Sequence, residues 1–335
     1  MNFTRFLANL AGALALAILG PAGEGLAQQK KPAVRLNYSG SVYAVTSVVA
    51  LERGFFDEEG LIVNASPESS GAVAVQALVG GSTDFAAAAN IRPVQMAAQD
   101  LPIRVIAVSS YGFAGHVIVP VKDKTTKTMA DLKGKRIGVQ VGSGTYTVWL
   151  RYLKTQGLSE KDFAIKSMES ETIPAAFEAQ ALDGAVLWDP FATLIREKGL
   201  GRDVLGPKDL AEPVGSTYAF YLITSLNNIQ KRPDVVQRFV NAWAKTLRFI
   251  QNNPDEMVEI MQAFFAREGK SLPPATVKKL MVTYRYDRVV VSPQDIQDTM
   301  ESARILFEQK RLKKLPDLNA YVDNSFALKA VQALK

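Results

Sequence analysis

A short glycine-rich loop follows a run of alternating apolar residues near the middle of the chain. The alternation of Ile137, Val139 and Val141 with small or polar neighbours predicts a buried strand over 136–141. The loop Gly142-Ser143-Gly144-Thr145 then opens a predicted helix over 145–156, with Ser143 as its N-cap. Backbone N–H groups at such a helix start carry partial positive charge and could bind a carboxylate, sulfonate or phosphate. A capped helix without any ligand is the alternative interpretation of this motif taken alone.

The sequence argues against the common catalytic and metal-binding chemistries. The chain has no cysteine, and His116 is its one histidine, which excludes thiolate–imidazole catalysis and ordinary zinc sites. It contains no nucleophile elbow, no Walker loop and no G-x-G-x-x-G, because the central glycines are spaced G-x-x-x-G-x-G. We therefore expect no catalytic residue, no metal, no cofactor and no enzymatic activity. His116 is expected to be structural or to lie at the rim of a cleft.

The elements that position the central loop form two series of alternating strands and helices. The strands of the first series are predicted at 34–38, 61–64, 84–89 and 103–108. Those of the second are predicted at 136–141, 163–165 and 185–188, and further strands at 116–121 and 219–224 bracket this series as crossovers. Helices are predicted at 41–53, 72–79, 145–156 and 173–182, and the chain after Pro233 is predicted to be nearly all helical. This alternation predicts an α/β fold of two lobes, each a mostly parallel sheet flanked by helices, with a helical C-terminal region.

The N-terminal residues 1–27 have the features of an export signal. Arg5 precedes an apolar stretch over 7–19, and Gly25-Leu26-Ala27 forms a small-x-small site that predicts cleavage after Ala27. No later segment is long and apolar enough to span a membrane, so we expect a periplasmic protein. The formal net charge of +6 is mild, and with this location we expect no nucleic-acid partner. The predicted divisions are 28–115 for the first part of lobe 1, 116–220 for lobe 2, and 221–335 for the return to lobe 1 and the C-terminal helices.

Candidate ligand contacts lie where the predicted parallel strands end, since ligands of open α/β sheets bind outside the carboxyl ends of the strands. Loops with small polar or aromatic residues follow these ends at 39–41, 69–71, 90–92, 142–145 and 188–190. Tyr111 and Tyr218 lie close to the predicted crossovers, where both lobes would face a cleft. Turn chemistry alone could explain any one of these loops, but not their joint placement at strand ends in both lobes.

Two charged residues leave the charge of a ligand open. Arg92 could pair with an anionic ligand, or it could be a solvated residue before Pro93. Asp189 could bind an amine or a ring N–H in the cleft, or it could cap the helix that begins at Pro190.

Several longer motifs resemble a known family. They are ALERGFFDEEGL at 50–61, GAVAVQALVGGSTDF at 71–85, the central motif at 131–145, and Trp188-Asp189-Pro190. In their order and spacing, up to about Ile250, they are similar to the periplasmic substrate-binding proteins of ABC importers of the sulfonate, nitrate, taurine and thiamine-precursor type. The resemblance implies the type II periplasmic-binding-protein fold with two crossovers. It also implies a solute held between the lobes and delivered to a membrane permease.

The resemblance also implies which residues contact the solute. By position, those of the first lobe are Ser39, Gly40, Ser70, Gly71 and Asn90. Those of the second lobe are Ser143, Gly144, Thr145, Trp188 and Asp189. Tyr111 and Tyr218 join the candidates because of their place near the crossovers, where an aromatic ring could stack on the solute.

The expected function is that of a monomeric receptor that captures a small organic solute by hinge closure. We expect the solute to be acidic, and an aromatic group fits the candidate rings. Two other functions stay open at this point. One is a cysteine-free enzyme of the same fold that acts on a pyrimidine-like ring, and the other is a ligand-sensing subunit for a membrane receptor.

Overall fold

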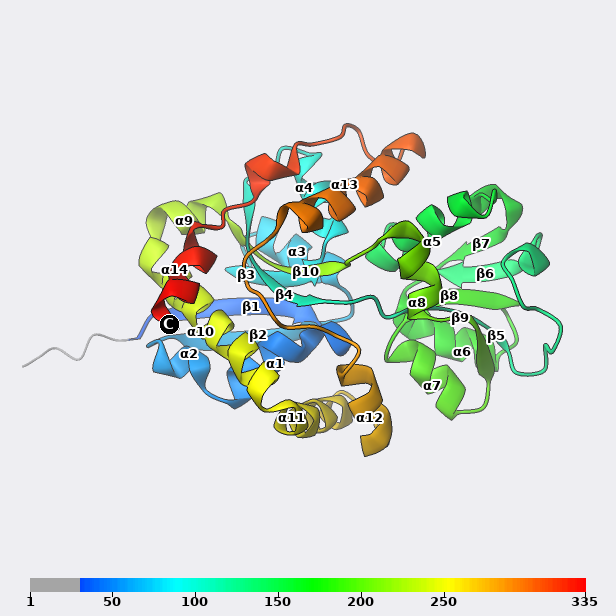
Figure 1. Cartoon of the computed structure of the whole chain (residues 1–335), viewed down its shortest axis with the longest axis horizontal. Coiled ribbons are helices and arrows are strands. Elements are labelled where there is room, and N and C mark those ends of the chain that lie inside the picture. Colours follow the sequence, from blue (N-terminus) through cyan, green and yellow to red (C-terminus); the bar gives the residue numbers. More distant parts are fainter. Residues whose placement is uncertain (1–30) are drawn as a thin grey trace, which may run out of the picture. The chain divides into compact units, whose positions relative to one another are not determined.

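Two five-stranded sheets organise the computed structural model, which describes residues 31–335 (Figure 1). The predicted export signal and its cleavage after Ala27 lie outside the described residues. Pro32–Lys335 forms one compact unit that contains both sheets. Among the described residues, no helix combines the length and hydropathy that a membrane span requires.

The first sheet has the strand order β2-β1-β3-β10-β4. β1 runs parallel to β2 and β3, whereas β10 runs antiparallel to its neighbours β3 and β4. The central strand β3 has the sequence FAAAA and is buried along nearly its whole length, as expected of a strand that is covered on both faces. The strands are β1 (Ala33–Ser39), β2 (Ile62–Glu68), β3 (Phe85–Ala89), β4 (Ile103–Tyr111) and β10 (Ala219–Ser225).

The second sheet has the order β7-β6-β8-β5-β9 and repeats the same plan. β6 runs parallel to β7 and β8, and β5 runs antiparallel to β8 and β9. The two predicted crossover strands are therefore the antiparallel strands of the two sheets, β5 and β10. The strands are β5 (Gly115–Pro120), β6 (Arg136–Val139), β7 (Ala164–Ser167), β8 (Gly184–Trp188) and β9 (Gly201–Leu205).

Helices cover both faces of each sheet (Figure 1). Those between the strands of the first sheet are α1 (Val45–Glu52), α2 (Phe55–Glu58), α3 (Gly71–Val79) and α4 (Ile91–Ala97). Those of the second sheet are α5 (Gly144–Thr155), α6 (Ile173–Glu178), α7 (Phe191–Glu197) and α8 (Pro207–Ala211). The C-terminal part is helical, as predicted, with α9 (Leu226–Lys231), α10 (Pro233–Asn252), α11 (Pro254–Arg267), α12 (Pro274–Met281), α13 (Pro293–Glu308) and α14 (Ser325–Ala333).

The apolar stripe of α10 forms part of the core beneath the first sheet. The ring of Phe239 stacks on Phe85 of β3 with 3.8 Å between centroids. Trp243 is fully buried and donates its indole N–H to the Val108 carbonyl of β4 at 3.2 Å. This stripe is therefore a packing face, as its helical periodicity predicted.

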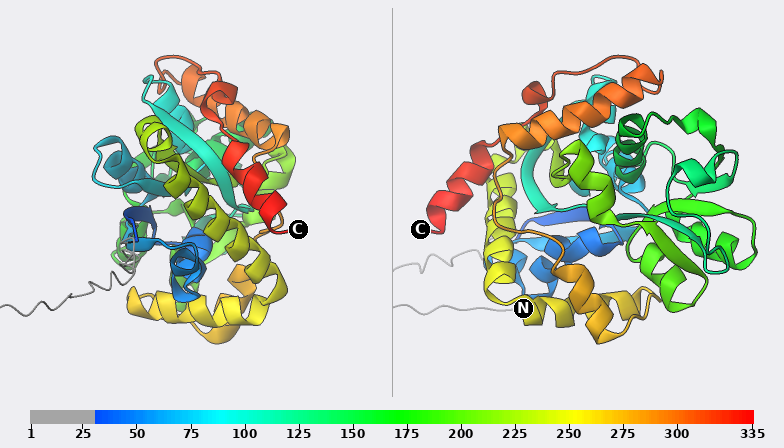
Figure 2. Two further views of the ribbon diagram at one scale, coloured as in Figure 1. Left: turned by 90° about the vertical axis from the view of Figure 1, so that its left-hand side faces the viewer. Right: turned by 45° about the vertical axis from the view of Figure 1, so that its right-hand side comes forward.

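Helix α13 contacts helices that flank each of the two sheets. It packs against α4, beside the first sheet, and against α5, beside the second (Figure 2). The buried carboxylate of Asp298 accepts a hydrogen bond from Arg151 of α5 at 2.7 Å. Residues close to the C-terminus thus connect elements from the two halves of the fold.

Several predicted boundaries were wrong, for local reasons. The predicted helix 41–53 begins instead with a 3₁₀ turn, Val42–Ala44, because the Ser41 hydroxyl accepts from the Tyr43 N–H and tightens the first turn. The predicted strand 136–141 ends at Val139, because the Gln140 carbonyl accepts from the Ser143 N–H and starts a turn. Strand β9 was missed, since its sequence GRDVL has two adjacent charged residues and no apolar alternation.

Candidate functional site

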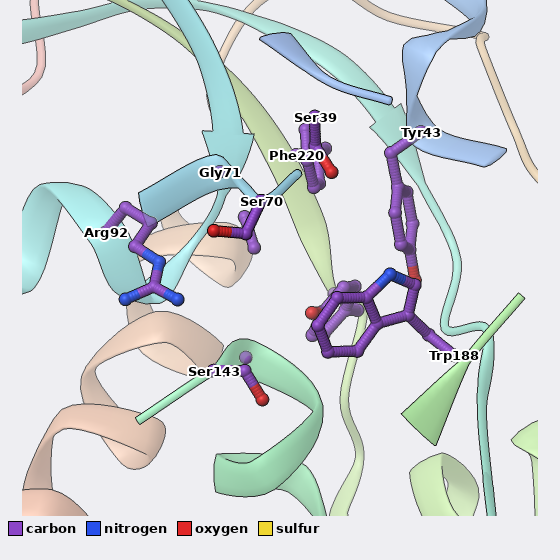
Figure 3. Close-up of a pocket in the computed structure, with 11 residues that line it drawn as sticks. Ser39, Tyr43, Ser70, Gly71, Arg92, Ser143, Trp188 and Phe220 are labelled. Carbon is purple, nitrogen blue, oxygen red and sulfur yellow. The ribbon is translucent and has the colours of Figure 1, made fainter. Parts of the chain in front are cut away.

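A small cavity lies between the two sheets, at the carboxyl ends of their strands. It encloses about 340 Å³ of empty space, open solvent at its mouth included. Elements of both sheets contribute to its walls, which Figure 3 shows in close-up. The lining residues are Ser39, Tyr43, Ser70, Gly71, Ala89, Arg92, Ser143, Gly144, Trp188, Tyr218 and Phe220.

The start of α5 forms part of one wall. Ser143 is its N-cap, as predicted, and the Ser143 hydroxyl accepts from the Tyr146 N–H at 3.0 Å. The Ser143 carbonyl accepts from the Thr147 N–H, so the N–H groups of Gly144 and Thr145 have no partner within the helix. These two groups carry the partial positive charge of the helix start.

Glycine is required at position 144 by a close approach across the cavity. A Cβ atom on Gly144 would lie only 2.3 Å from the Tyr218 hydroxyl oxygen. The phenol of Tyr218 therefore rests directly on the first turn of α5. Burial raises the pKa of Tyr218 to about 12, so this hydroxyl is neutral at physiological pH.

The start of α3 brings a second helix N-terminus to the same cavity. Its N-cap Ser70 has an extended backbone and makes no side-chain capping bond, so its hydroxyl does not satisfy the helix start. A Cβ on Gly71 would lie 3.1 Å from the Ala88 Cβ, which shows how closely α3 packs on β3. Two helix starts, one beside each sheet, thus border one small cavity.

Arg92 on α4 is the one cation in the cavity lining. Its Nη1 donates to Gln95 Oε1 at 2.8 Å, and no carboxylate of residues 31–335 forms an ion pair with its guanidinium. Burial lowers the pKa of Arg92 from its ordinary value, but a guanidinium stays charged at neutral pH. Figure 3 shows Arg92 near Ser70 and Ser143, on the side of the cavity opposite Tyr43 and Trp188. Arg92 also borders a neighbouring cavity together with Gln95 and Arg311.

Aromatic rings form the other part of the lining. Tyr43 stacks on Phe220 with 4.6 Å between centroids and packs against Tyr218 at 5.7 Å. The Tyr43 hydroxyl accepts from the Ala114 N–H at 3.0 Å, which holds this ring in place. Trp188, at the end of β8, is almost completely buried and packs edge-on against Phe191.

The structure brings together most, but not all, of the predicted ligand contacts. Those that line the cavity are Ser39, Ser70, Gly71, Ser143, Gly144, Trp188 and Tyr218. Those that do not line it are Gly40, Asn90, Tyr111, Thr145 and Asp189.

Asp189 lies outside the cavity lining because other groups surround its carboxylate. Its Oδ1 accepts from the Thr193 N–H and hydroxyl, which is the capping role weighed above, and Oδ2 lies 3.0 Å from His116 Nε2. Arg196 lies beside the same carboxylate at 3.4 Å. Its negative charge is therefore compensated within the protein.

Of the other four residues, Gly40, Asn90 and Thr145 each adjoin a lining residue in the sequence, whereas Tyr111 does not. The Gly40 carbonyl accepts from Lys270 Nζ at 2.8 Å, and the Tyr111 ring lies 3.9 Å from the Arg288 guanidinium carbon. Asn90 and Thr145 are buried, and the Asn90 amide has no hydrogen-bond partner within the described part of the chain.

Sequence reasoning missed Tyr43, Ala89 and Phe220 and left Arg92 undecided. Tyr43 follows the predicted strand-end loop at 39–41, so its place in the sequence could have indicated a ligand contact. Phe220 carries no such signal, because it reaches the cavity only through the insertion of β10 beside β3.

Comparison with known proteins supports both the fold and the family. The family model described as NMT1/THI5 like matches residues 42–257. A protein of Brucella abortus named as a binding protein is 28% identical over 262 residues, which cover 74% of this chain and 79% of the relative. The taurine-binding periplasmic protein of Escherichia coli is 27% identical over 208 residues, covering 62% of this chain and 63% of the relative.

The fold is shared with a solved structure of a binding protein. The alkanesulfonate-binding protein SsuA from Xanthomonas axonopodis pv. citri, bound to MOPS, matches with a TM-score of 0.73 and 22% identity. The match covers 88% of this chain and 98% of the SsuA chain. The predicted two-lobe α/β fold of the periplasmic binding proteins is thereby confirmed. Since the family model spans more than half of the sequence, this chain belongs to the NMT1/THI5-like family.

Proposed function

We propose that this protein is the solute-binding receptor of an ABC importer and that it holds a small organic anion between its two sheets. The observation that carries the proposal is the composition of the cavity wall. It contains one cation, Arg92, and two helix N-termini, and none of its lining residues has a carboxylate. The names of the relatives, which refer to taurine and alkanesulfonates, support an acidic solute.

The energetics require contacts beyond the acid group. A charge-assisted hydrogen bond contributes about 1.5–3 kcal/mol, and a helix N-terminus contributes about 0.3–1 kcal/mol. Micromolar affinity corresponds to a net binding free energy of about 8 kcal/mol. The contacts must supply more than this, because they also offset the entropic cost of association. We therefore infer that Trp188, Tyr43 and Phe220 bury an apolar or flat part of the solute.

The proposed mechanism is capture by closure followed by transfer, without chemical change. A solute that contacts walls from both sheets favours the state in which those walls are close. The periplasmic name of a relative supports the same location for this chain, where a membrane permease would receive the solute. The relatives are named for binding, which supports a receptor over an enzyme.

Isothermal titration calorimetry can test this proposal directly. Short alkanesulfonates, aromatic sulfonates, aromatic carboxylates and nitrate are each titrated, and every organic acid is paired with its neutral amide or sulfonamide. We expect at least one organic acid to bind with micromolar or better affinity and its neutral partner to bind far more weakly. Mass spectrometry of the recovered solute should show it unchanged, whereas a product would favour the enzyme alternative. Tight binding of neutral or cationic solutes alone would contradict the proposal.

Replacement of Arg92 by Gln removes the charge-assisted bonds to the acid group, so the affinity should fall by about 10- to 100-fold. The matched control is Arg304→Gln, because Arg304 lies on the exposed side of α13 and pairs with Glu301. An unchanged affinity in Arg92→Gln would exclude the proposed role of this guanidinium.

A further inference from the structure

Gln95 connects the cation of the cavity, which lies beside the first sheet, to a loop beside the second sheet. Its Oε1 accepts from Arg92 Nη1 at 2.8 Å, and its Nε2 donates to the Gly142 carbonyl at 3.1 Å. Arg92 and Gln95 belong to α4, beside the first sheet, whereas Gly142 precedes the N-cap of α5, beside the second. One side-chain amide therefore joins the two walls, and its bond to Gly142 exists only while those walls are close together.

The two partners determine the orientation of this amide. A carbonyl oxygen can only accept, so the NH₂ group of Gln95 must face Gly142 and its oxygen must face Arg92. The guanidinium then has one donor held by Gln95, and its other donors stay available to a bound anion. Gly142 has a φ of 79°, which favours glycine, whereas a Cβ at this position would make ordinary contact with the Gln95 amide at 3.6 Å.

The chemistry at this position favours an amide over a carboxylate. A carboxylate would accept from Arg92 equally well and would neutralise the cation that the cavity presents. It has no donor for the Gly142 carbonyl, so two acceptors would face each other. Glutamine is therefore suited to both contacts, and glutamate to one of them.

We propose that Gln95 is a positioning residue that couples the binding of an acid group at Arg92 to the closure of the two sheets. The inference rests on the proposed function, since it requires an anion at Arg92. An anion that orders the guanidinium also orders the Gln95 oxygen, and thereby presents the Gln95 NH₂ group to Gly142. The bond to Gly142 in turn holds Arg92 toward the solute, so binding and closure favour each other.

The test compares Gln95→Ala and Gln95→Glu with the control Gln99→Ala. Gln99 lies in the turn that follows α4, and its amide donates to the Gln95 backbone carbonyl, so its replacement leaves both side-chain contacts of Gln95 intact. Stopped-flow fluorescence measures the release rate of the acid found by calorimetry. We expect release to be about three- to tenfold faster in Gln95→Ala, from the loss of the hydrogen bond that joins Gln95 to Gly142, with little change in the control. In Gln95→Glu, the affinity for the acid should fall more than tenfold.

A second measurement reports closure without any solute. The chain has no cysteine, so the pair Val79→Cys and Lys161→Cys can carry spin labels on exposed positions beside the two sheets. With the two labels introduced into each variant, the distribution of distances between them should shift toward longer values in Gln95→Ala than in Gln99→Ala. Thermal unfolding of each variant verifies that it is folded.

The outcomes separate this inference from the proposed function. If the unsubstituted protein binds no organic anion, the proposed function fails, and the coupling to an anion fails with it. If it binds an anion, but Gln95→Ala and Gln99→Ala release it equally fast and show the same distance distribution, the role of Gln95 alone is overturned.

Discussion

His116 lies between two carboxylates. Its Nε2 is 3.0 Å from Asp189 and its Nδ1 is 3.1 Å from Asp203, while Arg196 of α7 pairs with both carboxylates. Burial lowers the pKa of His116, but the hydrogen bonds and charges of Asp189 and Asp203 outweigh that effect and raise it above its usual value. Burial likewise opposes ionisation of Asp189, yet His116, Thr193 and Arg196 lower its pKa. Asp189 follows Trp188 directly, so this network anchors one aromatic wall of the cavity.

The network predicts a defined pH dependence of stability. A histidine whose folded pKa lies above its unfolded value of about 6.5 stabilises the fold fully below that pH. This contribution is lost as the pH rises through the folded pKa. Asp189 has a lowered pKa in the folded protein, so its ionised form stabilises the fold at neutral pH. This stabilisation is lost as the pH falls below about 4. The unfolding free energy measured in urea should therefore decrease from pH 6 to pH 9 more steeply in the unsubstituted protein than in His116→Gln. Parallel pH profiles for the two proteins would refute this role of His116.

The helix starts of α3 and α5 are the elements on which the proposed binding of an anion depends. Each follows a strand end, and each begins with glycine at or next to the N-cap, so that backbone N–H groups lie open to the cavity. The packing of Tyr218 against Gly144 also leaves no room for a side chain at position 144.

Replacement of Gly144 by Ala tests this element. The added Cβ would lie 2.3 Å from the Tyr218 hydroxyl, so the phenol or the helix must move. We expect a loss of about 1–3 kcal/mol in unfolding free energy, as for other overpacked sites, together with more than a tenfold loss of solute affinity. Urea titration and calorimetry measure the two effects. Gly206→Ala is the control, because its φ is −95° and a Cβ there would make ordinary contact with Asp209 at 3.5 Å. Equal behaviour of the two variants would contradict the steric argument.

At the scale of the whole molecule, α13 holds the connection between the two sheets. Asp298 Oδ2 accepts from the Ser216 hydroxyl and from the N–H groups of Thr217 and Tyr218, each at 3.1 Å. Its Oδ1 accepts from Arg151 of α5. Tyr218 has a φ of 46°, an unfavourable conformation for a bulky residue, and Asp298 binds the backbone at that position. A C-terminal helix thus fixes the segment that leads from the second sheet into β10.

Removal of the Asp298 carboxylate should therefore affect global stability. In Asp298→Ala, the part-buried Arg151 guanidinium loses its carboxylate partner and two backbone N–H groups lose their acceptor, so the unfolding free energy should fall by about 3–5 kcal/mol. Asp255→Ala is the control, since Asp255 forms an exposed pair with Lys278 that should contribute less than about 1 kcal/mol. Chemical unfolding of both variants measures the difference. A loss of similar size in the two would show that Asp298 does not connect the sheets.

The amino-acid sequence by itself determined the features that depend on neighbouring residues. Apolar alternation, the N-cap Ser143 and the central glycines are local signals, and they located the strand, the loop and the helix of one cavity wall. They also predicted that the chain has two α/β lobes. Only the tertiary structure decided which side chains meet, because contacts across sheets depend on strand order. β10 lies between β3 and β4, and β5 lies between β8 and β9, although each is distant from its neighbours along the chain. That order brings Phe220 and Arg92 to the cavity, pairs Asp189 with His116, and places the Gln95 amide against Gly142.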